Sequence, residues 1–213
     1  MSPSEAFRVS RLPSIKGSVF AGVVEAVRKL VDQGEVSREQ AARWLQPADL
    51  ALLDAQISIA GWYDVRIFDR MSELLRDVAG GGSNDYLREL GRESARRLLA
   101  AGLYSQFEYL QRITATALTE RWARHEAFGR DLRRLTTMSG SIYNFGVWTI
   151  EPDAEHEMRH VIAVSDAAAF SDVICWRADG FINQMAHIRN RADMWAWRRI
   201  RPDVVHFRML QEV

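Results

Sequence analysis

Residues 139–152 read SGSIYNFGVWTIEP, and they mark a change in the character of the chain. The stretch is rich in β-branched and aromatic residues, which are typical of strands, and Pro152 favours a turn at its end. The next stretch, HEMRHVIAVSD at 156–166, alternates residue by residue, so that His160 and Ile162 fall on the same side. The two stretches together predict a pair of neighbouring antiparallel strands.

The remainder of the chain after residue 166 predicts a helix and then a second pair of strands. Apolar residues recur at helical spacing between 168 and 188, namely Phe170, Ile174, Phe181, Met185 and Ile188. Residues 192–213 read ADMWAWRRIRPDVVHFRMLQEV, and Arg201-Pro202-Asp203 interrupts them as a hairpin turn would. The order of elements from residue 139 onward is therefore β-β-α-β-β.

The first two-thirds of the chain are predicted to be helical. Residues 17–34 place apolar side chains at helical spacing, and Ser37 with Gln40 has the spacing of a capping box. GGGSND at 80–85 is the clearest linker and precedes a further helix. A long helical stretch is predicted from about residue 105 to residue 135.

These elements predict an α+β fold, in which an N-terminal helical layer is followed by a β-β-α-β-β antiparallel sheet. We expect residues 1–14 to be an N-terminal tail and residues 15–213 to form a single domain. Within that domain the helical part is expected at 15–137 and the sheet-containing part at 138–213.

Composition excludes several classes of protein. The 213 residues carry 28 basic and 28 acidic side chains, so no net charge attracts nucleic acid or an anionic membrane. No apolar run is long enough to span a membrane, and no secretory signal is apparent. The single cysteine, Cys175, cannot form an intramolecular disulfide and suits a reducing compartment. We expect a cytoplasmic protein that binds neither nucleic acid nor membrane.

One short motif raises a rival hypothesis. HEMRH at 156–160 matches H-E-x-x-H, the signature of zinc peptidases, in which both histidines share one face of a helix. A zinc-dependent metallohydrolase would use His156, Glu157 and His160. The alternation instead favours a strand, which would place the two histidines about 13 Å apart, too far to share one zinc. We therefore expect no catalytic residues and no metal site.

Aromatic residues gather in the second half of the chain. Their simplest role is to pack the core between the sheet and its helices. An excess of large aromatic side chains can also line a cavity for an apolar small molecule. The candidate ligand-binding residues are Tyr143, Phe145, Trp148, Trp176 and Phe181.

Several segments together resemble a known family. They are IKGSVFAGVVEAV (15–27), GWYDVRIFDRMSELL (61–75), LRELGRESARRLLAAGLY (87–104), CWRADGFINQM (175–185) and ADMWAWRRIRPDVVHFRML (192–210). The sequence resembles a heavily duplicated, uncharacterised family of myxobacterial proteins. That family is related to a ligand-binding superfamily that includes 4-vinyl reductase domains, haem nitric-oxide-binding domains and Golgi transport-complex subunits. The most specific segments are Trp62-Tyr63, Leu90-Gly91-Arg92 and the stretch from Cys175 to Gly180-Phe181.

The resemblance implies a sensory or adaptor module of a bacterial regulatory or signalling system, and pairing into homodimers or with a protein partner. The chain departs from the pattern at Asp64, where a proline is usual. It also lacks the zinc-binding cysteines of many 4-vinyl reductase domains and a histidine placed as a haem ligand, so no cofactor is expected.

We therefore expect a non-enzymatic sensory or adaptor module that binds a protein partner or a small apolar ligand. The adaptor version needs no cavity, whereas the ligand-binding version requires an internal void larger than one water molecule.

Overall fold

A four-stranded antiparallel sheet forms the second half of the molecule. The computed structural model describes residues 12–102, 120–139, 141–185 and 193–212. The strands are β3 (Val147–Pro152), β4 (His160–Ser165), β5 (Trp195–Arg201) and β6 (Val204–Met209), in the order β3-β4-β6-β5. Helix α8 (Asp172–Met185) connects β4 to β5. The predicted α+β fold with its β-β-α-β-β order is confirmed.

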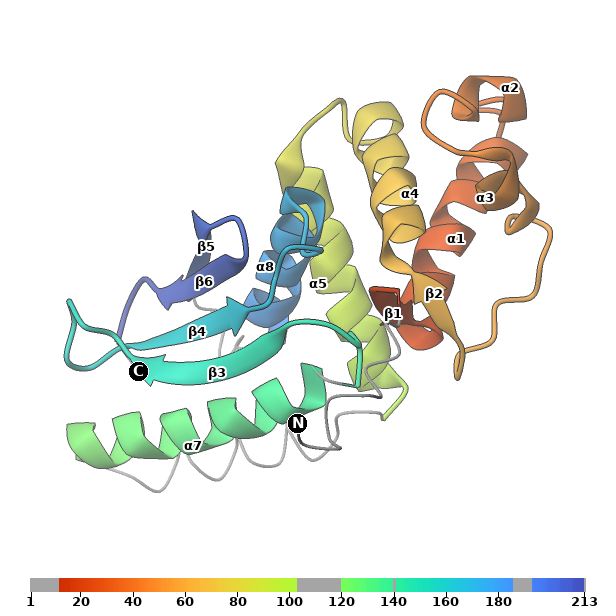
Figure 1. Cartoon of the computed structure of the whole chain (residues 1–213). Coiled ribbons are helices and arrows are strands. Elements are labelled where there is room, and N and C mark those ends of the chain that lie inside the picture. The colour runs from red at the N-terminus through yellow and green to blue at the C-terminus, as the bar shows by residue number, and fades with distance from the viewer. Residues whose placement is uncertain (1–11, 103–119, 140, 186–192, 213) are drawn as a thin grey trace, which may run out of the picture.

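Helices form most of the first half. They are α1 (Gly17–Asp32), α2 (Arg38–Ala41), α3 (Pro47–Ala51), α4 (Val65–Val78), α5 (Asn84–Ala100) and α7 (Arg121–Ser139). Helix α1 packs beside α4, α5 runs beside α8, and α7 lies along β3 (Figure 1). Side-chain oxygens of Ser37, Asp64 and Ser83 cap α2, α4 and α5. Part of the long helix predicted from residue 105 lies outside the described residues.

The helical layer also contains a small sheet that the sequence did not predict. Strands β1 (Ser14–Lys16) and β2 (Trp62–Asp64) pair antiparallel. Ile15 at its centre is fully buried, and the backbone N–H of Lys16 donates to the carbonyl of Ile142 at 2.8 Å. Strands of three residues are too short to show periodicity, which is why these were missed.

The two faces of the large sheet differ in what covers them. Side chains alternate between the faces, and the register places Ile150, Ile162, Phe207 and Trp197 in one row across the four strands. The neighbouring row on the opposite face holds Thr149, Ala163, His206 and Arg198, of which Thr149 and Arg198 are exposed. The first face is the one that the helices cover.

Helices α5 and α8 approach each other backbone to backbone. A Cβ atom on Gly91 of α5 would overlap the carbonyl oxygen of Arg177 on α8. A Cβ atom on Gly180 of α8 would likewise overlap the carbonyl oxygen of Arg88 on α5. Only glycine permits this separation, so the two residues set the position of α8 relative to the helical layer.

None of the helices in the described part of the chain is long and apolar enough to cross a membrane.

Candidate functional site: an apolar cavity with a buried arginine

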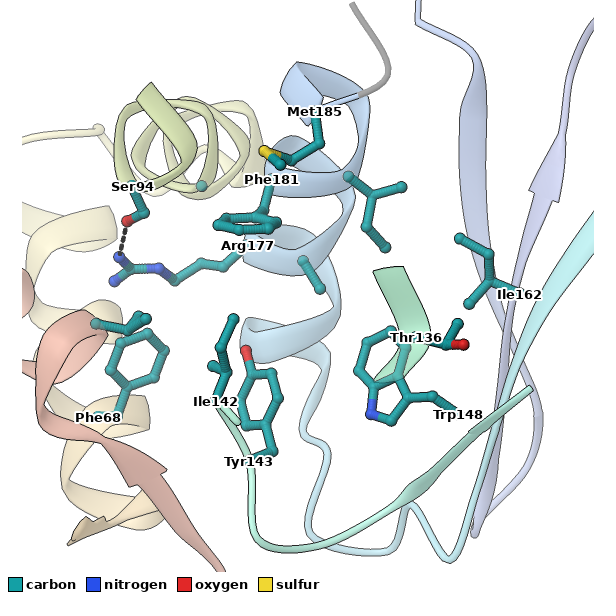
Figure 2. Close-up of a pocket in the computed structure, with 14 residues that line it drawn as sticks. Phe68, Ser94, Thr136, Ile142, Tyr143, Trp148, Ile162, Arg177, Phe181 and Met185 are labelled. Carbon is teal, nitrogen blue, oxygen red and sulfur yellow. Dashed lines mark hydrogen bonds between the residues drawn. The ribbon is translucent and has the colours of Figure 1, made fainter. Parts of the chain in front are cut away.

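A cavity of about 80 Å³ lies where α8 meets the helical layer and the sheet. Helix α8 contributes Ala178, Phe181, Ile182 and Met185 to its wall. Helix α7 contributes Thr136, and the sheet contributes Trp148 and Ile162. Figure 2 shows these side chains converging from separate elements. The cavity exists because the apolar stripe of α8 faces the covered face of the sheet without filling the space completely.

Three of the five predicted pocket residues line this cavity, and two do not. Tyr143, Trp148 and Phe181 are part of its wall. The Phe145 ring packs instead against Tyr143 and Phe170, with ring centres 5.6 and 6.3 Å apart. Trp176 makes an edge-to-face contact with Trp197 of β5, at 5.2 Å between ring centres. On α8, the cavity-facing stripe begins one residue later, at position 177.

Arg177 is the cavity residue that the sequence analysis missed. It is only 6% exposed, yet its guanidinium has no charged hydrogen-bond partner in the described part of the chain. Its Nη1 donates to the Ser72 hydroxyl at 2.8 Å and its Nη2 to the Ser94 hydroxyl at 3.4 Å. The same guanidinium lies over the ring of Phe68, 4.4 Å from the ring centre.

The position of Arg177 could have been recognised from its spacing. It falls three residues after Ile174 and four before Phe181, on the same predicted apolar stripe of α8. An arginine on such a stripe is buried with the stripe. Burial lowers the pKa of Arg177 to about 10, because the charged guanidinium is removed from water.

Polar contacts at both ends fix α8. At its start the Ser171 hydroxyl accepts from the backbone N–H of Ile174 and donates to Asp69 Oδ1 at 2.7 Å. Near its end the Asn183 Oδ1 accepts from the backbone N–H groups of Met194 and Trp195 at 2.8 and 2.9 Å. These contacts join α8 to α4 and to the start of β5, and so hold the cavity wall in place.

A salt-bridge network adds to these contacts along the α5–α8 interface. Arg88 of α5 donates to Asp179 of α8 at 2.7 Å and to Asp193 at 2.6 Å. Burial raises the pKa of Asp179, although the Arg88 guanidinium opposes this effect. Both carboxylates are therefore already paired, and neither belongs to the cavity.

The HEMRH segment does not have the geometry of a zinc peptidase. Residues 153–159 form the turn between β3 and β4, and the strand begins only at His160, four residues later than expected. His156 is exposed, whereas His160 is buried. Because the helix that the motif requires is absent from this segment, the two histidines and Glu157 do not form a metal site. No group of three or more metal-binding side chains occurs among the described residues.

His160 is instead part of the contact between α7 and the sheet. Its ring stacks on that of His125 from α7, with centres 4.1 Å apart and planes 6° apart. Its Nε2 lies 3.2 Å from the carbonyl oxygen of His125. The Nε2 of His125 is buried and has no partner in the described part of the chain. This pair fills the interior eleven residues along α7 from Thr136, away from the cavity.

Cys175 does not act as a nucleophile in this environment. It is fully buried, and burial raises the pKa of its thiol to about 12. The thiol therefore stays protonated near neutral pH and packs as a small apolar side chain.

Comparison with known proteins identifies the fold. No protein-family profile matches the sequence, and no curated protein matches it. Among solved structures, a mutant of the Fe(II) unliganded H-NOX protein from K. algicida is similar to this chain, with a TM-score of 0.55. The sequences are 13% identical, and the match covers 92% of this chain and 95% of that chain. An H-NOX structure from a study of haem distortion gives a TM-score of 0.48 and 13% identity, over 93% of this chain and 97% of that one. This chain thus has the fold of haem nitric-oxide-binding (H-NOX) domains, as the predicted superfamily implied, whereas membership of the myxobacterial family stays a prediction.

Proposed function

We propose that this chain is a non-enzymatic sensory module that detects a small, mainly apolar molecule by binding it in the cavity between α8, α7 and the sheet. The observation that carries the proposal is the cavity itself. A void of about 80 Å³ is several times the roughly 10–15 Å³ that one water molecule needs. The ligand-binding version of the prediction is therefore favoured over an adaptor with a filled interior.

The size of the cavity limits the ligand. An engineered cavity of about 150 Å³ in another protein binds benzene, so a void of about 80 Å³ suits a smaller molecule. Its wall is mostly aliphatic and aromatic, as in sites that bury the apolar part of a ligand.

Haem, which is named for the H-NOX neighbours, does not fit the residues present. The cavity is smaller than one that holds benzene, and a porphyrin is several times larger than benzene. Among the described residues, no histidine or cysteine lines it. The buried histidine of α7, His125, stacks on His160 at 4.1 Å, which leaves no space for a macrocycle between the rings. The proposed ligand is therefore not haem.

A sensory module needs an output, and we propose that a second copy of this chain or a protein partner receives it. Support comes from the sheet, because β3 and β5 are its outer strands and each has one unpaired edge among the described strands. Light scattering of the purified protein at micromolar concentration tests the homodimer. A monomer with no partner recovered from cells would contradict this part of the proposal.

Two further expectations from the sequence remain proposals. Buried apolar residues from Ile15 to Met209 belong to one cluster, which supports a single domain from residue 15 to the end. The free and buried Cys175 is compatible with the cytoplasm.

Xenon binding tests the proposed cavity site directly. Xenon is a small apolar probe that enters dry cavities, and its NMR signal shifts when it is bound. We expect binding to the native protein and its loss in Ala178→Leu, because the larger side chain fills the void. Ala196→Leu, on an exposed position of β5, is the matched control and should leave binding unchanged. The proposed function is wrong if the native protein binds no xenon and if native mass spectrometry detects no molecule that was retained during purification.

A further inference from the structure

We propose that the ligand of this cavity is an anion, a short-chain carboxylate whose charged group pairs with Arg177 and whose alkyl chain occupies the apolar part. This inference rests on the proposed function and names the chemical class of its ligand.

The first argument is that Arg177 forms no direct ion pair among the described residues, although the more distant charges of Glu93 and Asp69 attract it. Two other arginines that are partly withdrawn from water have such a partner: Arg70 pairs with Asp49 and Arg88 with Asp179, each at 2.7 Å. Arg177 is more deeply buried than either, yet within the described residues no carboxylate forms an ion pair with it. Its two hydrogen-bond acceptors are the neutral hydroxyls of Ser72 and Ser94.

The second argument is energetic. A buried charge that is not paired is strongly unfavourable, because the protein replaces its hydration only in part. Two hydroxyl groups and the ring of Phe68 compensate part of that loss. A carboxylate would accept two parallel hydrogen bonds from the planar guanidinium and supply the missing negative charge. Arg177 is therefore a site prepared for an anion.

The third argument is that the cavity reaches the charge. Phe68 and Ser94, which contact the guanidinium, also line the cavity together with Arg177. Figure 2 shows the arginine side chain extending from α8 beneath Phe181 toward Ser94, with the Tyr143 hydroxyl directed to the same interior. An anion in the cavity can thus approach Arg177 without a rearrangement of the helices.

The fourth argument is the polarity of the wall. Arg177 is the only charged residue that lines the cavity in the described part of the chain, and no acidic side chain repels an anion there. A wall that carries one positive charge and no negative charge favours an anionic ligand.

The size of the cavity limits which anions can fit into it. A carboxylate with a tail of one to three carbons has roughly four to six non-hydrogen atoms, which is no more than the six of benzene. The engineered cavity that binds benzene in another protein is larger than this one, at about 150 Å³. Acetate, propionate and butyrate span this range. The chain of a longer fatty acid would extend beyond the cavity.

The experiment compares matched pairs of ligands on the full chain. Dissociation constants are measured by calorimetry for propionate and for propionamide, which has nearly the same shape but no charge. We expect propionate to bind about tenfold more tightly or better, as for hydrogen bonds that involve two charged groups. This comparison uses the native protein and so does not depend on how a variant folds.

Two variants assign the preference to Arg177. Arg177→Met keeps an apolar stem of similar length and should abolish the preference for propionate while xenon still binds. Arg198→Met, at an exposed position on the far face of the sheet, should leave the preference intact. The inference is overturned if propionamide binds as tightly as propionate, or if Arg177→Met keeps the preference. Xenon binding separates the two proposals, since its absence from the native protein would overturn the cavity function as well.

Discussion

Two of the helices that line the cavity, α7 and α8, are held in different ways. Helix α8 contacts α5 through backbone atoms at Gly91 and Gly180, reinforced by the ion pair of Arg88 with Asp179. Helix α7 contacts the sheet through aromatic rings. His125 stacks on His160, and the ring centres of Phe128 and Trp195 are 6.4 Å apart. A side chain added at Gly129 of α7 would meet the ring of His160 rather than backbone.

This difference separates a fixed wall from an adaptable one. A backbone contact can be relieved only by moving a whole helix, whereas a ring contact is relieved by a change of rotamer. Helix α8, which carries Arg177, is therefore the fixed wall, and α7 is the adaptable one. The following substitutions test whether the two walls differ as described.

The largest effect is expected at the glycines between α5 and α8. Gly91→Ala or Gly180→Ala should lower the free energy of unfolding by about 3 kcal/mol or more, because the added Cβ overlaps a carbonyl oxygen of the neighbouring helix. Chemical denaturation monitored by circular dichroism measures the change.

Gly22→Ala in α1 is the matched control for these glycines. Its Cβ would meet only the end of the Arg97 side chain, and alanine is favoured in a helix by about 0.5–1 kcal/mol. Stability should therefore be kept or slightly raised. Equal losses in all three variants would mean that the α5–α8 contact is no tighter than an ordinary helix surface.

The contrast between these walls also explains how much could be predicted from sequence. The sheet and α8 were predictable because alternation and helical spacing report directly on which residues are buried. Tyr143, Trp148 and Phe181 were named as candidate pocket residues for a different reason, the gathering of large aromatic side chains in this half of the chain, and all three line the cavity. Phe145 and Trp176 could not be distinguished from them. A shift of one residue along a strand or helix changes the direction of the side chain, and this direction decides whether the side chain faces the cavity.

Other features depend on contacts between segments far apart in the chain. Gly91 and Gly180 lie 89 positions apart, and a glycine in a helical pattern indicates only a weaker helix until its neighbour is known. Arg177 had a local signal, its place on the apolar stripe, but its lack of a carboxylate partner is a tertiary property. The HEMRH pattern shows the opposite case, in which a local motif has no meaning because its helix is not formed.

A smaller effect is expected at the start of α8, where the fixed wall carries one unfavourable group. Burial raises the pKa of Asp69 to about 6, although the Ser171 hydroxyl donates to it. The carboxyl of Asp69 therefore stays protonated in the folded state at pH values at which it has lost its proton in the unfolded state. As a result, the free energy of unfolding falls as pH rises from about 4 to about 6.

Asp69→Asn should remove this loss, because an amide can accept the same hydrogen bond without a charge. At pH 7 the variant should be more stable than the native protein by about 1–2 kcal/mol, less than the full value of the pKa shift because Asp69 is partly exposed. At pH 4 the two proteins should be equal. Urea denaturation at both pH values measures this, and a variant that is less stable at pH 7 would show that the carboxylate is favourable there.

The smallest effect is expected at the adaptable wall, where His160 titrates in the opposite sense. Burial lowers the pKa of His160, partly offset by its hydrogen bond to the His125 carbonyl, while the charges of His125 and Arg133 lower it further. A histidine with a depressed pKa stabilises the fold above the pKa of an exposed histidine, about 6.5, and this contribution is lost as pH falls below that value. Protonation would also place a charge against the stacked ring of His125. The native protein should therefore lose stability as pH falls below about 6.5, whereas His160→Gln, which cannot titrate, should show a shallower dependence. His156→Gln, four residues earlier in the exposed turn, is the control for the same substitution. If the pH dependence of His160→Gln follows that of the native protein, acid does not act on the fold through the contact between α7 and the sheet.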